Sequence, residues 1–439
     1  MHSIMTLRIA ALYLPLTAAI VAGLLGSRRE RVFAACLLSL LWTFPALLVL
    51  QRINLMDGWW SFRRTTPALL GMPLEFYLGW AVLWGVVPSL AFRRLNLLGV
   101  IVLMGALDLW LMPLSAPLLT LHEHWLRGEA VALALVLAPA FCIARWTLED
   151  THLALRAMLQ VVISGLLFLF LLPEITFALR PTANASSVWQ PLLQMGGFSR
   201  QTAIQLILLL AVPGVSAVIE FVQRGRGTPI PYDPPQRMVM SGIYRYCANP
   251  MQFSCAIVMF AWACLLRNPW LVLAAFLSTF YSAGIAHWDE GFDLSARFGE
   301  SWRQYRAAVP VWRLRWRPYH SGPPARLYIA RNCDPCSDIR RWIEQRHPVG
   351  LELIDAETLP EGSINRLRYD PDDGTPSAEG VVAFARVLEH LNFAWAYCGI
   401  TLRLPILHQS VQLVMDASGL GPRTVRSREM RGGPAIRPL

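Results

Sequence analysis

The sequence predicts an α-helical protein that crosses a membrane many times and carries a small α/β domain near its C-terminus. Hydrophobic residues make up 55% of the 439 residues and charged residues only 15%, whereas soluble chains carry about 25% charged residues. About nine apolar runs are each long enough to span a bilayer as a helix. Residues 325–423 contain no such run and alternate short strand-like and helical patterns, which indicates an α/β domain.

The predicted spans lie near Ile9–Leu25, Val32–Leu50, Pro73–Phe92, Leu97–Leu111, Ala130–Ala144, Met158–Phe177, Ile204–Val222, Met251–Leu266 and Leu271–Ile285. The first run lacks a small-x-small cleavage site and is followed by arginines, so we interpret it as an uncleaved span rather than a signal peptide. After the second span, Trp59, Trp60 and Phe62 predict an amphipathic segment at the membrane interface.

The net charge of +10 comes from arginines that gather in short bursts between the spans. This is the positive-inside pattern, so the charge indicates membrane topology and not a nucleic-acid partner. With nine spans, the arginine-rich loops fall on the same face as the C-terminal part. We therefore expect an integral membrane protein, of the bacterial inner membrane, with its N-terminus outside and its C-terminal domain in the cytoplasm.

The chain divides into four predicted parts. Residues 1–200 form N-terminal spans without a recognisable motif, residues 201–318 form a membrane domain with a motif, and residues 325–423 form the α/β domain. Residues 424–439 are rich in Arg, Gly and Pro, which is typical of a disordered tail. A basic, aromatic stretch within 297–317 suits the surface of an anionic leaflet.

The most informative motif consists of two blocks on either side of a helical hairpin. A Gly-Thr-Pro-Ile-Pro segment leads to the first block, which contains Tyr244, Arg245, Asn249 and Pro250, and Glu290 begins the second. Asn249 is expected to cap and Pro250 to begin a helix whose N-terminus attracts anions. Because the hairpin returns to the same face, Glu290 can lie opposite that helix start. A cationic end and an anionic end together suit a zwitterionic amino-acid group.

These blocks resemble the isoprenylcysteine carboxyl methyltransferase family, which is related to the membrane phospholipid methyltransferases, over roughly residues 220–318. The resemblance implies S-adenosylmethionine as methyl donor at the cytoplasmic face and a membrane lipid or lipidated acceptor that enters from the bilayer. It also implies a donor site lined by Tyr244, Arg245, Asn249 and Pro250, with Glu290 binding the amino group or ribose of the donor. The chain has no Gly-rich loop after a strand, so a Rossmann-type donor site is not expected.

Three positions depart from the family pattern. Ala248 replaces an arginine before Asn249, Gln252 replaces a tyrosine, and Gly291 replaces the second glutamate of a pair. A cation, a phenol and a carboxylate are thereby lost together. We interpret the chain as a membrane methyltransferase because of the paired blocks. The three departures keep a non-catalytic membrane scaffold as an alternative.

A second motif, Cys333-Asp-Pro-Cys336, follows a strand-like run and opens a predicted helix. A helix N-terminus stabilises the thiolate of the first cysteine of such a pair. The region resembles the thioredoxin-like, DCC-type family of predicted thiol-disulfide oxidoreductases, which implies a redox role for Cys333 and Cys336, a thiol or disulfide partner and, by position, a cis proline at Thr375-Pro376.

Two other interpretations of these cysteines remain. One is a pair of structural cysteines. The other is a zinc site, which would need two more ligands, and only the distant His347 and Cys398 are candidates, so we expect no metal. A membrane-anchored thiol-disulfide oxidoreductase that uses Cys333 and Cys336 is thus the main functional alternative to the methyltransferase.

Overall fold

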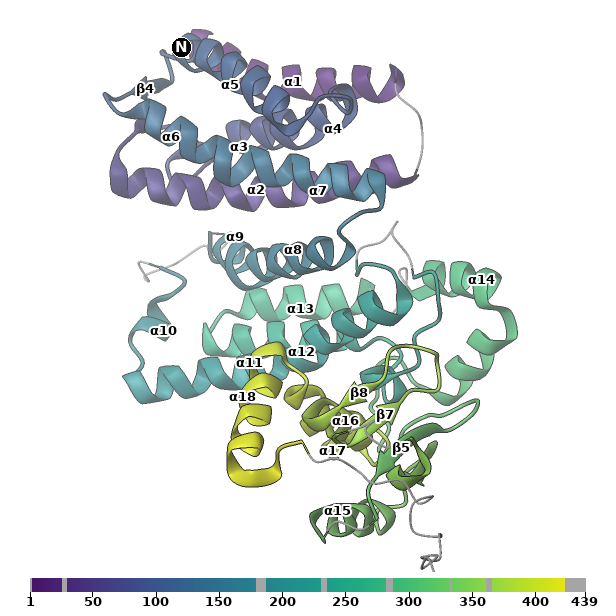
Figure 1. Ribbon diagram of the computed structural model, residues 1–439. Coiled ribbons are helices and arrows are strands. Elements are labelled where there is room, and N and C mark those ends of the chain that lie inside the picture. Colours follow the sequence, from purple (N-terminus) through teal and green to yellow (C-terminus); the bar gives the residue numbers. More distant parts are fainter. Residues whose placement is uncertain are drawn as a thin grey trace, which may run out of the picture. The chain divides into compact units, whose positions relative to one another are not determined.

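The structure, a computed structural model, describes residues 2–25, 30–178, 187–229, 235–281, 287–331, 334–360 and 365–422. The chain forms two compact units (Figure 1). The first comprises Met1–Ala178 and Gly227–Pro234, and the second comprises Leu179–Arg226 and Pro235–Leu439.

The first unit is a bundle of apolar helices: α1 (His2–Leu25), α2 (Glu30–Asp57), α3 (Leu74–Trp80), α4 (Val87–Ala91), α5 (Leu97–Leu114), α6 (Trp125–Ala132), α7 (Ala138–Glu149), α8 (Leu153–Gly165) and α9 (Leu172–Ala178). Short π-helical segments at Ala81–Val86, Leu133–Leu137 and Leu166–Leu171 join α3 to α4, α6 to α7 and α8 to α9. The result is six helical stretches long and apolar enough to cross a membrane.

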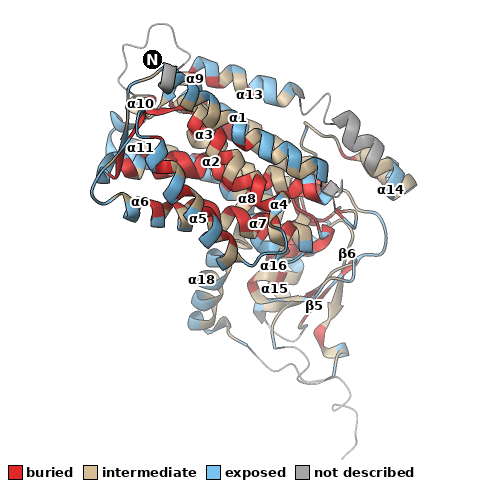
Figure 2. Cartoon of the chain, turned by 90° about the horizontal axis from the view of Figure 1, so that it is seen from above, coloured by how far each residue is buried: buried red, intermediate tan, exposed pale blue. Residues whose placement is uncertain are grey.

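Helix α2 lies at the centre of this bundle. Over its most apolar stretch 56% of its residues are buried, compared with 11% for α1, and buried residues recur along α2 in Figure 2. Close packing at Gly85 explains part of this burial, since a Cβ on Gly85 would lie 2.9 Å from the Thr43 hydroxyl of α2. The Ser39 hydroxyl donates to the Gly85 carbonyl oxygen at 2.8 Å. Small and hydroxyl side chains of this kind allow helices to approach closely inside a membrane.

The tryptophans of the predicted interfacial segment are buried within the protein. Residues Trp60–Phe62 form strand β1, which pairs antiparallel with β4 (Leu119–Leu121), and a second small sheet joins β2 (Ala68–Leu69) to β3 (Met72–Pro73). Trp60 is only 7% exposed, because its ring packs directly on the backbone of Gly128. A Cβ at position 128 would lie only 2.5 Å from the Trp60 ring. Packing against α6 therefore replaces the expected contact with lipid headgroups.

The part of the second unit that precedes residue 309 contains the apolar helices α11 (Gly197–Glu220), α12 (Pro250–Leu265) and α13 (Pro269–Tyr281), together with the short α10 (Gln190–Leu193) and the polar α14 (His287–Ala308). A π-helical segment, Phe221–Gly225, extends α11 and completes the seventh helix that meets the length and hydropathy of a membrane span in the described part of the chain. Helices α12 and α13 occupy the positions of the eighth and ninth predicted spans, but their 16 and 13 residues are fewer than those of the other seven.

The C-terminal part of the second unit contains β5 (Ala325–Ile329), α15 (Asp334–Glu344), β6 (Leu351–Asp355), β7 (Arg368–Asp370), β8 (Ala378–Glu379), α16 (Gly380–Leu388), α17 (Phe393–Leu402) and α18 (Pro405–Met415). The sheet order is β6-β5-β7-β8, with β5 parallel to β6 and antiparallel to β7. A small α/β arrangement is thus present where the sequence predicts one. The cis peptide among the described residues precedes Pro67 and not Pro376, contrary to expectation.

Apolar contacts attach this α/β part to the membrane helices of the same unit. Ile400 of α17 packs in one buried cluster with Val212 and Ala217 of α11. The Tyr397 hydroxyl donates to the Leu209 carbonyl oxygen of α11 at 2.5 Å. The α/β part is therefore docked on α11 and does not simply follow a linker.

A buried histidine stabilises the core of the α/β part in its neutral form. His390 is 1% exposed, its Nδ1 lies 2.7 Å from the Val349 carbonyl oxygen and its Nε2 lies 2.9 Å from the Tyr369 hydroxyl. The carbonyl can only accept, so Nδ1 carries the proton and Nε2 accepts from Tyr369. Burial, reinforced by the charge of Arg245, holds the pKa of His390 well below its ordinary value. Burial also raises the pKa of Tyr369 to about 12, which keeps this phenol a donor.

The stability of this part should therefore fall as the pH falls below about 6.5. In the unfolded chain His390 then binds a proton, whereas in the folded protein its lowered pKa keeps it neutral. We expect the free energy of unfolding to drop by up to about 1.4 kcal/mol per pH unit between pH 6.5 and 5.5. Near-UV circular dichroism during unfolding of the detergent-solubilised protein measures this slope. His390→Asn should lose this contribution and His347→Asn, at an exposed histidine, should keep it; equal slopes for both variants would contradict the assignment.

Candidate functional site

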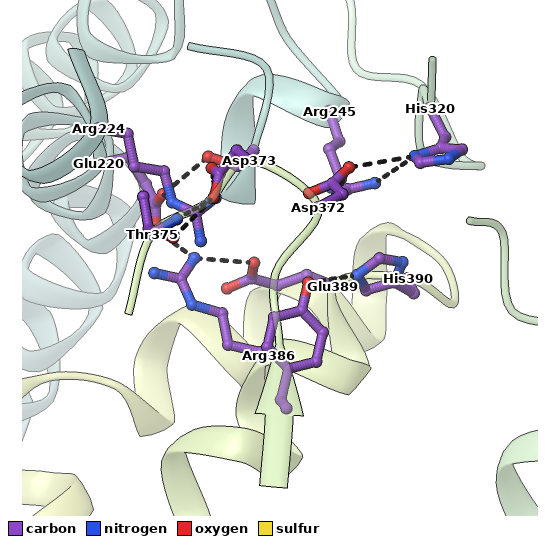
Figure 3. Close-up of polar contacts among 12 residues, drawn as sticks. Glu220, Arg224, Arg245, His320, Asp372, Asp373, Thr375, Arg386, Glu389 and His390 are labelled. Carbon is purple, nitrogen blue, oxygen red and sulfur yellow. Dashed lines mark hydrogen bonds and ion pairs between the residues drawn. The ribbon is translucent and has the colours of Figure 1, made fainter. Parts of the chain in front are cut away.

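A buried carboxylate ends α11 at the point where this helix meets the α/β part. Glu220 is fully buried, and three arginines surround it: Arg224, Arg386 and Arg403. Figure 3 shows the first two. Its Oε2 lies 2.9 Å from Arg224 Nε, and its Oε1 lies 2.5 Å from Arg386 Nη1 and 2.6 Å from Arg403 Nη1. Arg224 is one turn further along the same chain, whereas Arg386 and Arg403 come from α16 and from the end of α17.

A second carboxylate nearly balances the charge of these arginines. Glu389 Oε1 lies 2.7 Å from Arg403 Nη2 and its Oε2 lies 3.3 Å from Arg386 Nη1. Arg224 also pairs with Asp373. With Asp373 included, three carboxylates face three arginines. Burial lowers the pKa of Arg386, but Glu220 and Glu389 more than compensate and leave the pKa above its ordinary value. Buried charges of this kind are stable only when each has close partners of opposite sign.

We call Glu220, Arg224, Arg386, Glu389 and Arg403 the ion cluster. No more than 10% of any of these side chains is exposed. Its members come from two parts of the second unit that are far apart in sequence. The cluster therefore fixes the α/β part against the end of α11.

The segment that precedes Tyr244 is shaped to accept Glu220. Ser241 donates from its hydroxyl to Glu220 Oε2 at 2.9 Å. Gly242 has φ of +59°, and a Cβ at this position would lie 2.9 Å from Glu220 Cγ. A glycine at this position thus avoids both the left-handed backbone strain and the clash that another residue would cause.

Hydrogen bonds hold the 3₁₀ turn Gly242–Arg245 in place. The Tyr305 hydroxyl of α14 donates to the Tyr244 carbonyl oxygen at 2.8 Å, and the Tyr319 backbone N–H donates to the Arg245 carbonyl oxygen at 2.9 Å. The Tyr246 hydroxyl donates to the Glu389 carbonyl oxygen at 2.9 Å. Burial raises the pKa of Tyr246, so this hydroxyl remains a donor. The turn is thereby tied to α14 and to the α/β part at once.

The Arg245 side chain lines a cavity of about 60 Å³ beside this turn. The cavity is lined by Arg224, Met238, Met240, Ser241, Arg245, Tyr319, His320, Ser321, Asp372 and Asp373. Arg245 is 3% exposed; its Nη1 lies 3.5 Å from His320 Nδ1 and its Nη2 lies 3.9 Å from Asp372 Oδ2. Asp372 Oδ2 is also 3.7 Å from His320 Nδ1. The side chains of Arg245, His320 and Asp372 face one another around the cavity at distances longer than an ordinary ionic hydrogen bond (Figure 3).

Asn249 and Pro250 start α12 as the sequence predicts. The Asn249 side-chain oxygen accepts from the Gln252 backbone N–H at 3.4 Å, and Pro250 is the first helical residue. Gln252 stands where the related family has a tyrosine, and its side-chain oxygen is buried without a hydrogen-bond partner among the described residues. Leaving a buried hydrogen-bond acceptor without a partner costs free energy. This oxygen is therefore suited to accept a hydrogen bond from a ligand.

The structure thus brings Tyr244, Arg245, Asn249 and Pro250 into one continuous segment. Glu290 lies in α14, and its side chain is outside the described residues, as is the whole of Cys333. Cys336 lies in the first turn of α15, after β5.

The sequence analysis missed the partners of Arg245, which are His320 and Asp372, and it missed the role of Glu220. One signal could have found Glu220. It is an acidic residue in an otherwise apolar span, and such residues are usually retained for a specific partner or function. Asp372 carries no comparable signal because it lies in a polar loop.

Residues 206–300 match the phospholipid methyltransferase family. The match contains all five residues of the predicted donor site and ends before the α/β part begins. No curated protein and no solved structure matches the chain. The apolar helices and this family match together indicate a membrane methyltransferase.

Replacing Glu220 by Gln should destabilise the second unit strongly, because three buried arginines then lose an anionic partner. Removal of one partner from a buried ion pair costs about 3–5 kcal/mol. We expect a correspondingly lower free energy of unfolding and faster proteolysis after residue 320 in the detergent-solubilised protein. Glu300→Gln provides the control, since Glu300 forms an exposed pair with Arg303 on α14. Equal stability of the two variants would show that the ion cluster does not hold the α/β part in place.

Proposed function

We propose that this protein is an S-adenosylmethionine-dependent methyltransferase that acts at the cytoplasmic membrane face on a lipid-like or prenylated acceptor. The observation that carries this proposal is the position of Arg245. This residue belongs to the segment that matches the phospholipid methyltransferases, and its guanidinium faces a cavity that also presents a carboxylate. The cytoplasmic orientation rests on the distribution of arginines among the loops.

The described residues fit the amino-acid end of the donor. Arg245 would hold a carboxylate, and Asp372 would hold an ammonium group, because a cation and an anion border the same cavity. The weak pairing among Arg245, Asp372 and His320, with distances of 3.5–3.9 Å, leaves their hydrogen-bonding capacity available. The methionine end of S-adenosylmethionine carries both charges.

The nucleoside must lie outside this cavity. A volume of about 60 Å³ has room for a few water-sized groups and not for an adenosine. Glu290, which the family resemblance assigns to the amino group or ribose, belongs to the neighbouring helix α14. We propose that the donor extends from the Arg245 cavity along the start of α12 toward α14, with the Gln252 oxygen as one of its contacts.

A lipid-like acceptor is supported by the outer surface of the membrane helices. Large apolar side chains are exposed along α11, α12 and α13: Ile204, Leu206, Leu208, Leu209, Ile257, Phe260, Phe276, Leu277 and Phe280. These surfaces face lipid in a membrane protein, so an acceptor with an acyl or prenyl chain reaches the site without entering water.

The donor supplies a methyl group on a sulfonium centre, which is already a good leaving group. The task of the protein is therefore to hold donor and acceptor in line and to exclude water, and it needs little acid-base assistance. Arg245 is suited to this task because the hydrogen bonds from Tyr305 and Tyr319 fix the turn that carries it. Its own role would be to anchor the donor and not to transfer a proton.

Arg245→Ala and Asp372→Asn should each weaken binding of S-adenosylmethionine by about 10-fold to 100-fold. A buried charge-assisted hydrogen bond contributes about 1.5–3 kcal/mol, and 1.4 kcal/mol corresponds to a factor of ten. Glu290→Ala should have an effect of the same order. Equilibrium binding of radiolabelled S-adenosylmethionine to the detergent-solubilised full-length protein measures these affinities.

Two controls make this measurement specific. Arg303→Ala removes an arginine that is 68% exposed, and Cys333→Ser removes the first cysteine of the second motif; neither should change donor affinity. If the wild-type protein binds no donor at millimolar concentration, the departures at Ala248, Gln252 and Gly291 have abolished the activity, and the scaffold or oxidoreductase alternative replaces it.

A thiol-disulfide oxidoreductase is the second candidate, and the observation that favours it is the placement of Cys336. This residue lies in the first turn of α15, directly after β5, which pairs parallel with β6. In such a reaction the Cys333 thiolate attacks a partner disulfide to form a mixed disulfide. The Cys336 thiolate then displaces the partner, which leaves as a dithiol while the Cys333–Cys336 disulfide forms.

If this second candidate is correct, Cys333 should be the more reactive thiol. Alkylation of the reduced protein at increasing pH, followed by peptide mass spectrometry, should label Cys333 before Cys336 and before the exposed Cys398, because a helix N-terminus lowers the pKa of a thiol. Labelling of both cysteines at the same alkaline pH would instead identify a structural pair.

A further inference from the structure

The first unit contains a second cavity that the proposed methyl transfer does not use. It measures about 40 Å³ and lies among helices α2, α3, α5 and α6, close to strand β1. Its lining consists of Leu47, Leu50, Gln51, Trp60, Phe62, Met72, Phe76, Trp80, Trp84, Met112, Glu129 and Ala132. Five aromatic rings and one carboxylate thus surround a space for a small group.

The aromatic wall is well ordered by its own contacts. Phe76 stacks on Trp80 with ring centroids 5.1 Å apart, and Phe62 meets Phe76 edge-on at 5.5 Å. Trp60 donates from its indole N–H to Gln51 Oε1 at 3.2 Å, which fixes the ring at the cavity. The faces of such rings carry negative partial charge and attract cations.

Glu129 supplies the carboxylate, and it lacks a cation. This side chain is 5% exposed, and its Oε1 is buried without a hydrogen-bond partner among the described residues. Asp108 of α5 is fully buried nearby, close enough to interact electrostatically with Glu129, and accepts from the Trp80 indole N–H at 3.3 Å. Among the described residues neither carboxylate forms an ion pair.

The two carboxylates lie at a similar depth in the bundle. Asp108 is six residues before the end of α5 at Leu114, and Glu129 is four residues after the start of α6 at Trp125. At 1.5 Å per residue these positions are roughly 9 Å and 6 Å from the same end of the bundle. An acidic residue at such a position in a membrane span is costly unless a partner compensates its charge.

The neighbourhood of Glu129 is built for this contact. Gly128 precedes it, and a Cβ on Gly128 would lie 2.5 Å from the Trp60 ring and 2.7 Å from Trp59. The tryptophans therefore pack directly on the backbone beside Glu129. Any larger residue at position 128 would push the aromatic wall away from the carboxylate.

We propose that this cavity binds an organic ammonium group. Stacked aromatic faces together with a buried, unpartnered carboxylate favour a cation that presents C–H and N–H groups, as ammonium compounds do. An inorganic cation would need several oxygen ligands, and the wall offers mainly aromatic carbon. A neutral ligand would leave the carboxylates without a partner.

The group reaches the cavity from the outer side of the membrane under the predicted topology. By sequence, the opposite end of the first unit carries seven arginines (Arg28, Arg29, Arg31, Arg93, Arg94, Arg145 and Arg156), whereas the cavity end carries five (Arg8, Arg52, Arg63, Arg64 and Arg127). The positive-inside rule places that end in the cytoplasm. The ammonium group can accordingly belong to a lipid headgroup of the outer leaflet or to a free amine outside the membrane.

Binding of radiolabelled choline and ethanolamine to the full-length protein in detergent tests this proposal. We expect saturable binding that tetramethylammonium chloride displaces. Neither equimolar sodium chloride nor 3,3-dimethylbutan-1-ol, the neutral isostere of choline, should displace it. Absence of saturable binding would overturn the proposal. So would displacement by the neutral isostere that equals displacement by tetramethylammonium.

Variants locate the site. Glu129→Gln and Asp108→Asn should each weaken binding at least about tenfold, since each removes a buried charge that the ammonium compensates. Glu123→Gln alters an exposed carboxylate shortly before α6 and should leave binding unchanged. Unaltered affinity in Glu129→Gln, with a melting temperature equal to that of the wild type, would refute the assignment.

Nanodiscs distinguish the two sources of the group. Choline binding is compared in discs of phosphatidylglycerol alone and in discs that also contain phosphatidylethanolamine. Weaker choline binding in the second discs identifies a lipid headgroup as the occupant, and equal binding identifies a free amine.

Discussion

The second unit depends on one interaction, the burial of Glu220 among three arginines. A carboxylate at the end of an apolar span is unfavourable in isolation, and only Arg386 and Arg403, from a part of the chain about 170 residues later, complete its environment. The end of α11 therefore depends on the docked α/β part for its stability. Arg224 and Glu389 extend the same requirement to the neighbouring loop and to α16.

This constraint also shapes the candidate donor site. The segment 241–246 is held by Glu220 through Ser241 on one side and by the Glu389 carbonyl oxygen through Tyr246 on the other. Arg245 lies between these anchors and faces Asp372, which belongs to the α/β part. The proposed donor site is thus shared between the methyltransferase-like helices and a domain that the family match does not include. Under the proposed function, such sharing would allow Arg245 and Asp372 to present a cation and an anion to the donor.

The first unit also buries acidic side chains, but aromatic rings and not arginines surround them. Asp108 and Glu129 lie in apolar helices, and the groups near them are Trp80, Trp84 and Trp60, which offer indole N–H groups and ring faces. Gly128 and Gly85 permit this packing because a side chain at either position would displace an adjoining helix or ring. The buried acids of the two units thus have different surroundings: arginines pair with Glu220 in the second unit, whereas indole groups and aromatic rings lie near Asp108 and Glu129 in the first, and no ion pair to either is present among the described residues.

The sequence alone determined the helices, the start of α12 at Asn249 and Pro250, and the presence of a small α/β part, because apolar periodicity and capping are local properties that neighbouring residues decide. It also assigned Tyr244 and Arg245 to a donor site through a compact motif, and this assignment stays a prediction. Only the tertiary structure decided what Arg245 and Glu220 contact, since Asp372, Arg386 and Arg403 are remote in sequence and sit in patterns typical of any polar surface. It likewise buried Trp59 and Trp60 and placed Trp60 in a cavity wall. The deciding residue is Gly128, because a side chain at this position would clash with both rings.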